Sequence, residues 1–317
     1  MIDISTAFAK PRPRLLLVAS NGGHLEQLHR LSEGSDIAPD SQWVTFDTPQ
    51  AHGLLDSSRT HYVPPVEQRD ALGAIRAVPR LRRILASGRF DGVVSTGAAI
   101  AAPAFVAART RGLPTLYIES VSRVEGPSVT GRLVYRSRLA STVWTQHEAW
   151  RTGRWEYHGS VLDRFESVPA EATESKPSLF VTLGTLRRYP FPRPVERLVE
   201  IGAVDERTIW QLGVTPAPDR LPGEVNDFFS SARFDAAALS AGVVVSHAGV
   251  GSVLRLIEMG VYPILVVRRS AHGEHIDDHQ AQIARLLEQR NLAIVREADE
   301  ITLDDLHAAS ARKIRPL

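Results

Sequence analysis

The sequence predicts an α/β protein built from two Rossmann-like domains that face a central cleft. Short apolar runs alternate with helix-like stretches along the chain, which is typical of parallel sheets covered by helices on both faces. The 317 residues suffice for two domains of roughly 150 residues each. A polar segment with two prolines, residues 164–178, follows the first complete set of strands and helices. We therefore predict an N-terminal domain over residues 1–165 and a C-terminal domain over residues 166–317.

Ten apolar runs are predicted as strands, and the helical pattern is clear over residues 98–111 and 276–290. The predicted strands are 14–20, 42–46, 91–96, 114–120 and 141–146 in the first domain, and 178–185, 208–213, 242–249, 263–269 and 292–297 in the second. Folds of this kind bind ligands beyond the carboxyl ends of their strands. We therefore expect the loops that follow the strands to face the cleft and to carry the chemistry.

The amino-acid composition limits the metal chemistry, the cellular location and the binding partners that we expect. The chain has no cysteine, which excludes disulfides and thiolate metal sites and fits a cytoplasmic protein. No apolar run approaches the ~18 residues of a membrane span, and the N-terminal residues lack the apolar core of a secretion signal. Residues 1–165 hold 20 Lys and Arg against 15 Asp and Glu. This basic half favours an anionic lipid surface or an anionic ligand, and scattered surface arginines are the alternative.

The first glycine-rich loop is SNGGHLEQ, residues 20–27, where Gly22 and Gly23 connect a predicted strand to a helix. Amides exposed at a helix N-terminus suit a phosphate group, whereas a tight turn that needs a positive φ is the plain alternative. His24 lies at a strand end that should face the cleft. With a reference pKa near ~6.5, a histidine there suits a general base.

Two further glycine-rich loops follow strands of the second domain. In TLGT, Gly184 allows close backbone approach and Thr185 offers a hydroxyl, although a simple turn explains the pattern equally well. The better loop is VVVSHAGVGSVLRLIEMG, residues 243–260, where a strand leads through two glycines into a helix and suits a diphosphate. The absence of GK[ST] argues against a phosphoryl-transfer ATPase. Its candidate donor-binding residues are Ser246, His247, Gly249, Gly251 and Ser252.

The segment HGEHIDDHQ, residues 272–280, concentrates three histidines beside the third loop. His275 and His279 are four residues apart and would share one face of a helix, as two zinc ligands can. Ile276, however, stands where the HExxH motif needs its glutamate, so the zinc interpretation is weak. His279 and Gln280 are placed to meet the hydroxyls of a sugar, because glutamine both donates and accepts hydrogen bonds.

These motifs together resemble a known family. SHAGVGS with GEHIDDHQ resembles the donor-binding half of glycosyltransferases of the family 28 type, which have the GT-B fold. SNGGHLEQL and YIESVSRVEGPSVTGRLVY, residues 117–135, resemble the partner subunit of the dolichol-pathway UDP-N-acetylglucosamine transferase. The chain is therefore similar to a fusion of the membrane-anchor-type and catalytic subunits, and to bacterial exopolysaccharide homologues. The resemblance covers nearly all of residues 14–300.

The resemblance implies an inverting, metal-independent transfer of GlcNAc or a related hexose or uronic acid. The donor would be a UDP-sugar and the acceptor a lipid-linked glycan on polyprenyl diphosphate, or a related acceptor, at the cytoplasmic membrane face. It implies no cofactor, no metal and no nucleic-acid partner. The donor would contact Gly184, Thr185, Ser246, His247, Gly249, Gly251, Ser252, His279 and Gln280, and the acceptor would contact Asn21, Gly22 and Gly23. His24 is the expected general base, with Glu119 as the alternative.

The chain departs from the family pattern in one donor-side residue. Relatives often carry an acidic residue for the ribose hydroxyls where this chain has Arg255, and Glu258, one turn further along the helix, is the expected substitute. Two other classes of function stay open. One is a nucleotide-sugar 2-epimerase. The other is a non-catalytic protein that binds a nucleotide sugar, or a metal through His272, His275 and His279.

The chain also lacks the N-terminal membrane helix that the partner subunit often has. AIRAVPRLRRIL, residues 74–85, is the candidate for peripheral contact with an anionic membrane, with Ile75, Val78, Leu81 and Leu85 opposite its arginines. An ordinary basic surface helix is the alternative. We expect the proline at position 79 to disturb the middle of such a helix.

Overall fold

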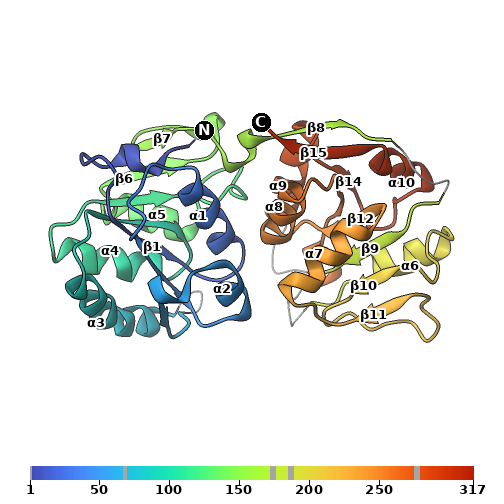
Figure 1. The fold of residues 1–317 in the computed structure, drawn as a ribbon, viewed down its shortest axis with the longest axis horizontal. Helices are drawn as coiled ribbons and strands as arrows, with labels where there is room; N and C mark the ends of the chain where they lie inside the picture. The colour runs from blue at the N-terminus through green and yellow to red at the C-terminus, as the bar shows by residue number, and fades with distance from the viewer. Residues whose placement is uncertain (1, 67–69, 172–175, 185–188, 275–278) are drawn as a thin grey trace. The chain divides into compact units, whose positions relative to one another are not determined.

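The computed structural model describes residues 2–66, 70–171, 176–184, 189–274 and 279–317. The chain divides between Asp163 and Arg164 into two compact units, close to the predicted boundary (Figure 1). Both units contain a parallel sheet with helices packed on it. This confirms the predicted α/β class with two Rossmann-like domains.

The first unit contains a seven-stranded sheet in the order β3-β2-β1-β4-β5-β6-β7, and every neighbouring pair is parallel. Its strands are β1 (Leu15–Ala19), β2 (Gln42–Phe46), β3 (Thr60–Val63), β4 (Gly92–Gly97), β5 (Thr115–Ile118), β6 (Thr142–Thr145) and β7 (Trp155–Tyr157). Its helices are α1 (Gly23–Glu33), α2 (Pro49–Leu54), α3 (Ala71–Ser87), α4 (Ala101–Arg109) and α5 (Val129–Arg136), with short 3-10 helices η1 (Ile4–Ala7), η2 (Ser57–Arg59), η3 (Glu148–Trp150) and η4 (Val161–Arg164).

The apolar strands explain why this sheet lies in the middle of the unit. All five side chains of β1 are buried, and they alternate between two cores, as side chains of a strand must. Leu16 and Val18 pack with α3 and α4 in one core, whereas Leu15 and Leu17 pack with α1 in the other. Leu25, Leu28 and Leu31 of α1 are buried against the sheet, so this helix covers the sheet with its apolar side.

The second unit contains a six-stranded parallel sheet in the order β11-β10-β9-β12-β13-β14. Its strands are β9 (Leu179–Thr182), β10 (Ile209–Gln211), β11 (Glu224–Asn226), β12 (Val243–His247), β13 (Ile264–Val266) and β14 (Ile294–Arg296). Its helices are α6 (Arg193–Glu200), α7 (Ser231–Ser240), α8 (Val250–Glu258), α9 (His279–Gln289) and α10 (Leu303–Ser310), with the 3-10 helix η5 (Ser270–His272). A separate antiparallel pair joins β8 (Phe165–Pro169) to the C-terminal β15 (Arg312–Pro316).

The ten predicted strands are all present, with small differences at their ends. The helix predicted over residues 74–85 is longer and continuous, and Pro79 lies inside it, so the expected disturbance was wrong. Pro79 is on the exposed side, where water can satisfy the carbonyl that loses its hydrogen bond. Leu81 and Leu85 of this helix are buried in the core of the unit. Among the described residues, no helix is long and apolar enough to cross a membrane.

Candidate active site

The carboxyl edge of the first sheet holds the first group of predicted residues. The strand order reverses between β1 and β4, and ligands of such folds bind at this switch point. The pairing of the two strands shifts there, because Val18 lies opposite Ser95 but Ala19 lies opposite Gly97. Thr96 is therefore the extra residue of a bulge, a feature that re-aims side chains and backbone groups near sites.

His24, in the first turn of α1, is held by this bulge. Its Nδ1 lies 2.8 Å from the carbonyl oxygen of Thr96, and the Thr96 hydroxyl donates back to the His24 carbonyl at 2.7 Å. A carbonyl oxygen only accepts, so we assign the ring proton to Nδ1, which leaves Nε2 as the basic nitrogen. A side chain at Gly97 would lie 3.1 Å from the ring, so the glycine makes room for the imidazole.

The surroundings of His24 keep the ring neutral. Burial lowers its pKa below the ordinary value of 6.5; the hydrogen bond to Thr96 opposes this shift, and the positive charge of Arg123 adds to it. A neutral imidazole with a fixed Nδ1–H is the form that accepts a proton at Nε2. The environment therefore gives His24 the protonation state that a general base requires.

The predicted acceptor-side residues form the turn before α1. Asn21 and Gly22 are exposed, and Gly22 has φ +73° at the helix N-cap, a conformation that suits glycine. The turn is fixed by Gln50, whose Oε1 accepts from the Gly22 amide at 2.6 Å. Gly23 begins α1, so the turn lies at the helix N-terminus, and its contact with a phosphate stays a prediction.

Glu119 follows β5 and is fully buried. Its Oε1 accepts from the Ser120 amide at 3.1 Å and the Tyr117 hydroxyl at 3.2 Å, and its Oε2 accepts from the Ser128 amide and hydroxyl at 2.9 and 3.0 Å. Burial raises its pKa, and the bonds from Ser128 and Ser120 oppose this. Both oxygens are thus used to hold the segment from Ser120 to the N-cap of α5.

A pair of buried glutamines connects these elements, and the sequence analysis did not single them out. Gln27 of α1 donates from Nε2 to the Ser120 hydroxyl at 3.0 Å and accepts at Oε1 from the Val121 amide at 2.8 Å. Gln146, after β6, donates to Gln27 Oε1 at 3.1 Å and to the Glu119 carbonyl at 3.0 Å. The ends of β5 and β6 and the start of α1 are therefore one hydrogen-bonded assembly.

The corresponding edge of the second sheet lies between β9 and β12. His247 ends β12, and its ring lies between Gly184 and Gly249. A Cβ built on Gly184 would lie 2.6 Å from the His247 ring, and one on Gly249 would lie 2.2 Å from its Nε2. Any larger residue at either glycine would displace the imidazole. Gly184 also has φ +81°.

Gly249 is the N-cap of α8, the helix that follows β12, and among the described residues no side-chain hydrogen bond caps this helix. Gly251 and Ser252 lie in this first turn and are partly exposed. Ser246 is fully buried, and its hydroxyl donates to the His247 carbonyl at 3.0 Å. The open N-terminus of α8 therefore offers amides and a helix dipole to an anion.

Arg255 and Glu258 have different positions on α8. Arg255 donates from Nε and Nη2 to the two carboxylate oxygens of Asp235 on α7, at 2.6 and 2.8 Å. Glu258 is the last residue of α8, roughly 12 Å along the axis from its first residue at 1.5 Å per residue. The structure therefore does not bring Glu258 to the open helix N-terminus.

Arg268, after β13, is a buried arginine that the sequence analysis missed. Its guanidinium donates to the carbonyl oxygens of Leu183 at 2.6 Å, Tyr189 at 2.5 Å and Glu274 at 2.9 Å, and it lies over the Phe191 ring. Burial lowers its pKa to about 10. Arg268 thus joins the loop after β9, which contains Gly184, to the loop after β13.

Glu274 extends this connection to α6. Its carboxylate is 3% exposed and accepts two hydrogen bonds from Arg193, at 2.7 and 2.8 Å, and one from the Arg269 amide at 2.9 Å. Such a two-pronged pair fixes geometry as well as charge. The loop that precedes the predicted sugar-side residues is therefore held from two directions.

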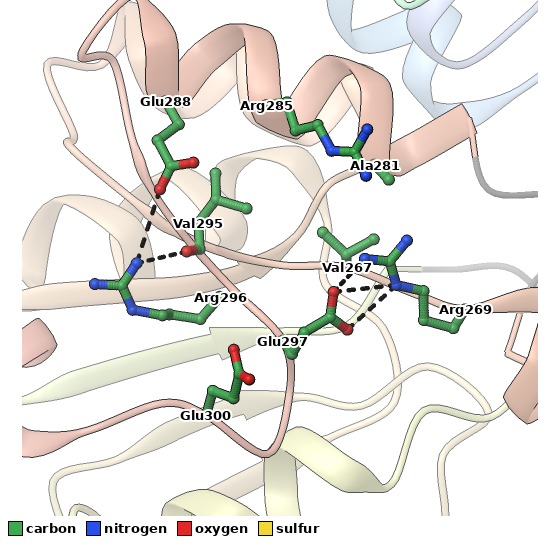
Figure 2. A pocket seen from close by; sticks show the side chains of 9 residues that line it. All are labelled: Val267, Arg269, Ala281, Arg285, Glu288, Val295, Arg296, Glu297 and Glu300. Carbon is green, nitrogen blue, oxygen red and sulfur yellow. Dashed lines mark hydrogen bonds and ion pairs between the residues drawn. The ribbon is translucent and has the colours of Figure 1, made fainter.

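A pocket of about 530 Å³ lies beside these loops, between the ends of β13 and β14 and helix α9 (Figure 2). Its charged residues are largely paired with one another, since Arg269 binds Glu297 and Arg296 lies 3.7 Å from Glu288. It is lined by Val267, Arg269, Ala281, Arg285, Glu288, Val295, Arg296, Glu297 and Glu300. None of the predicted donor residues lines it, so this pocket is not the diphosphate site at α8.

Part of the predicted donor site lies outside the described residues. Thr185 and His275 belong to the segments that the structure does not describe, and only the backbone of His279 is described, as the first residue of α9. Gln280 is partly exposed, and its Oε1 has no partner among the described residues. Within the described ranges, no group of three potential ligands could hold a metal ion. The predicted roles of these residues stay predictions.

Comparison with known proteins supports the fold. Residues 223–313 match the glycosyltransferase family 28 C-terminal domain. A UDP-N-acetylglucosamine–N-acetylmuramyl-(pentapeptide) pyrophosphoryl-undecaprenol N-acetylglucosamine transferase from Trichodesmium erythraeum is 28% identical over 245 residues, which cover 73% of this chain and 63% of that protein. The enzyme of the same name from a Synechococcus strain is 40% identical over 121 residues, covering 34% and 32%. The chain thus spans less than two thirds of the length of these relatives.

Solved structures share the architecture. The crystal structure of Acinetobacter baumannii MurG superposes with a TM-score of 0.56 at 20% identity, covering 93% of this chain and 89% of that one. The glycosyltransferase SnogD from Streptomyces nogalater superposes with a TM-score of 0.60 at 16% identity, covering 94% and 92%. The fold is therefore the GT-B fold, and the match to the family 28 C-terminal domain lies within the second unit. The matched domain contains α8 and its open N-terminus.

Proposed function

We propose that this chain is a UDP-sugar-dependent glycosyltransferase that transfers GlcNAc, or a closely related sugar, to an acceptor linked to polyprenyl diphosphate. The observation that carries the proposal is the family 28 match over residues 223–313, which contains the open N-terminus of α8 beside His247. The relatives are named as transferases that move GlcNAc to a pyrophosphoryl-undecaprenol-linked sugar, which supports this donor and this acceptor.

The second unit would bind the donor. Its diphosphate would accept hydrogen bonds from the first amides of α8, near Gly251 and Ser252, and the helix dipole would offset its charge. His247, held between Gly184 and Gly249, would form one wall of that position. The sugar would extend toward His279 and Gln280 at the start of α9.

The first unit would supply the base. In the proposed reaction, the acceptor hydroxyl gives its proton to Nε2 of His24, and the hydroxyl oxygen bonds to the anomeric carbon from the side opposite UDP. The bond from the anomeric carbon to the diphosphate oxygen breaks, and its electron pair leaves with UDP. The sugar is thus transferred with inversion. The amides of α8 stabilise the charge on the departing diphosphate, so the proposed step needs no metal.

A transfer assay with UDP-GlcNAc and a short-chain prenyl-diphosphate-linked sugar tests this proposal. We expect turnover that survives EDTA, an inverted linkage by NMR, and a loss of about 10²–10⁴-fold in His24→Ala. The exposed His307 supplies the control, because His307→Ala should keep normal turnover. Near-normal turnover of His24→Ala would remove the base assignment. Formation of UDP-ManNAc from UDP-GlcNAc without acceptor would instead indicate a 2-epimerase.

A further part of the proposal is that one chain combines two halves that act together. The first unit carries the turn at residues 20–27 and the segment 117–135, and the second carries the family 28 domain. We propose that the chain unites the acceptor half and the donor half of a dolichol-pathway-like or exopolysaccharide transferase. Expression of residues 1–163 and 164–317 as separate chains tests this idea. Transfer that requires both halves, and is absent from either alone, is the expected result.

We also propose that helices α3, α4 and α5 contact an anionic membrane at the cytoplasmic face. The three helices lie against the same core (Figure 1), and together they carry seven arginines and no acidic residue. Four large apolar side chains on α3 and α5 are exposed: Leu72, Ile75, Val129 and Leu133. Apolar insertion beside basic side chains is how interfacial helices bind anionic lipids.

Co-sedimentation with vesicles tests the membrane proposal. We expect binding to vesicles that contain phosphatidylglycerol, weaker binding at high salt, and loss of binding in Ile75→Glu with Leu133→Glu. Val225→Glu is the matched control, because Val225 is an exposed apolar residue of the second unit. Equal binding to neutral vesicles, or unchanged binding of the double variant, would contradict the proposal.

A further inference from the structure

Arg123 lies in the turn after β5 and was not among the residues predicted from the sequence. It is partly buried, and its backbone is fixed on both sides. Its amide donates to the Ser120 carbonyl at 2.9 Å, and its own carbonyl accepts from the Trp150 indole at 3.1 Å. The turn is held further by Gln27, which binds the Val121 amide at 2.8 Å. The position of Arg123 is therefore set by the fold.

Among the described residues, the guanidinium group of Arg123 makes no hydrogen bond and no ion pair. Most other arginines that are partly buried bind an acceptor, as Arg154, Arg193 and Arg255 do. A partly buried cation without a bonded partner is unfavourable for stability. Such a group suggests that its partner is a ligand.

The charge of Arg123 acts on three groups at the carboxyl edge of the first sheet. These are His24, Tyr117 and Glu119. Glu119 is the acidic member, but both of its oxygens are occupied by hydrogen bonds from Tyr117, Ser120 and Ser128. Its bonds leave it unable to serve as the partner of the guanidinium. An anion that arrives beside His24 would therefore meet the Arg123 guanidinium, which has no bonded partner among the described residues.

We propose that Arg123 binds a phosphate of the acceptor's diphosphate and so places the acceptor hydroxyl at His24. This inference rests on the proposed function. The turn at Asn21 and Gly22 is exposed, but the Gly22 amide already donates to Gln50, so Arg123 supplies both the donors and the counter-charge. A guanidinium suits this task because its planar donors match phosphate oxygens in pairs.

The same side chain tunes the base. Burial keeps the pKa of His24 low, and the Arg123 charge lowers it further. Among the described residues, Arg123 is the ionised side chain that acts on this ring. Tyr117, whose hydroxyl faces the same Gly97, stays neutral because burial raises its pKa. Removal of the Arg123 charge should therefore raise the pKa of His24.

Steady-state kinetics of Arg123→Gln, Arg123→Lys and Arg89→Gln test the proposal. Arg89 is an exposed arginine at the opposite edge of the sheet, before β4, and serves as the control. We expect Arg123→Gln to raise the KM for the diphosphate-linked acceptor by about 10- to 100-fold, the usual effect of a lost charged hydrogen bond. The KM for UDP-GlcNAc should stay unchanged, and Arg123→Lys should recover part of the loss. The acid limb of kcat/KM should move to higher pH in Arg123→Gln.

A merely structural role would not produce this pattern. An unchanged acceptor KM in folded Arg123→Gln, or a raised KM for UDP-GlcNAc in its place, overturns the proposal. Calorimetric titration with inorganic diphosphate gives a reading that needs no turnover, and weaker binding by Arg123→Gln than by Arg89→Gln supports the site. If wild-type protein transfers no sugar but shows this difference, the proposed function fails while the anion site stands. If transfer is normal and the variants bind diphosphate equally, the anion site fails while the function stands.

Discussion

Replacement of Arg268 by methionine should destabilise the second unit and weaken donor binding together. The guanidinium donates to the carbonyl oxygens of Leu183, Tyr189 and Glu274, and Arg268 is only 2% exposed. Methionine fills a similar volume but leaves three carbonyls without these donors. Each fully unsatisfied carbonyl lowers the free energy of unfolding by about 1–3 kcal/mol. Relief of the buried charge offsets part of this sum, because charge burial is itself unfavourable. We expect a net loss of about 2–4 kcal/mol.

Urea unfolding followed by fluorescence measures this change, because Trp210 is buried in the second unit. A loss of about 2–4 kcal/mol corresponds to a fall of roughly 5–15 °C in melting temperature for a domain of this size. Arg285→Met is the matched control, since Arg285 is exposed in the nearby pocket and should change stability by less than about 0.5 kcal/mol. A difference below about 0.5 kcal/mol between Arg268→Met and wild type would refute the reasoning.

Three further outcomes follow from the site. Gly184→Ala should lower the affinity for a UDP-sugar by at least about tenfold in calorimetry, because the new methyl group meets the His247 ring and an alanine is strained at φ +81°. Equal affinity of variant and wild type would contradict the close contact between residue 184 and the His247 ring. Glu119→Gln should lower the free energy of unfolding by about 1–3 kcal/mol, because an amide nitrogen then faces backbone donors; wild-type stability would show that the carboxylate is not needed there. The free energy of unfolding should fall as pH drops below 6.5, because the folded pKa of His24 is lowered and the unfolded chain binds that proton first. His24→Gln should reduce this pH dependence, and a pH profile identical to that of the wild type would contradict the prediction.

The fold could be predicted from the sequence wherever strands are apolar on both faces. Strands such as β1 and β4 are buried throughout and stand out as continuous apolar runs. The strands that were missed are short and lie at edges. β3, β7 and β11 end their sheets, and none of their sequences, THYV, WEY and EVN, is buried throughout. The polar pair of β8 and β15 depends on partners that lie far apart in the sequence, such as Arg312 opposite Pro169.

The loops that form the candidate site could be predicted from the sequence, but the contacts between their side chains could not. Glycines and histidines after strands indicated the turn at His24 and the loop at His247, because residue type and spacing carry that signal. Arg268 and Arg123 were missed, since arginine is normally exposed and nothing local shows that one is buried or unpaired. Gln27 was quoted within its loop, yet its role appears only when α1 meets the ends of β5 and β6. Such long-range packing is absent from any single segment.

In both units a histidine at the switch point of the sheet packs against a glycine at or just after the end of the neighbouring strand, but a different strand of the pair leads to the histidine in each unit. In the first, the histidine follows β1 and binds the Thr96 carbonyl of β4 beside Gly97. In the second, the histidine ends β12, and its Nδ1 lies 3.4 Å from the Thr182 carbonyl of β9, beside Gly184. Each ring lies at the switch point of its sheet and against a glycine with positive φ. The glycines are therefore needed for the placement of the histidines rather than for the sheets, and a side chain at either position should affect ligands before it affects folding.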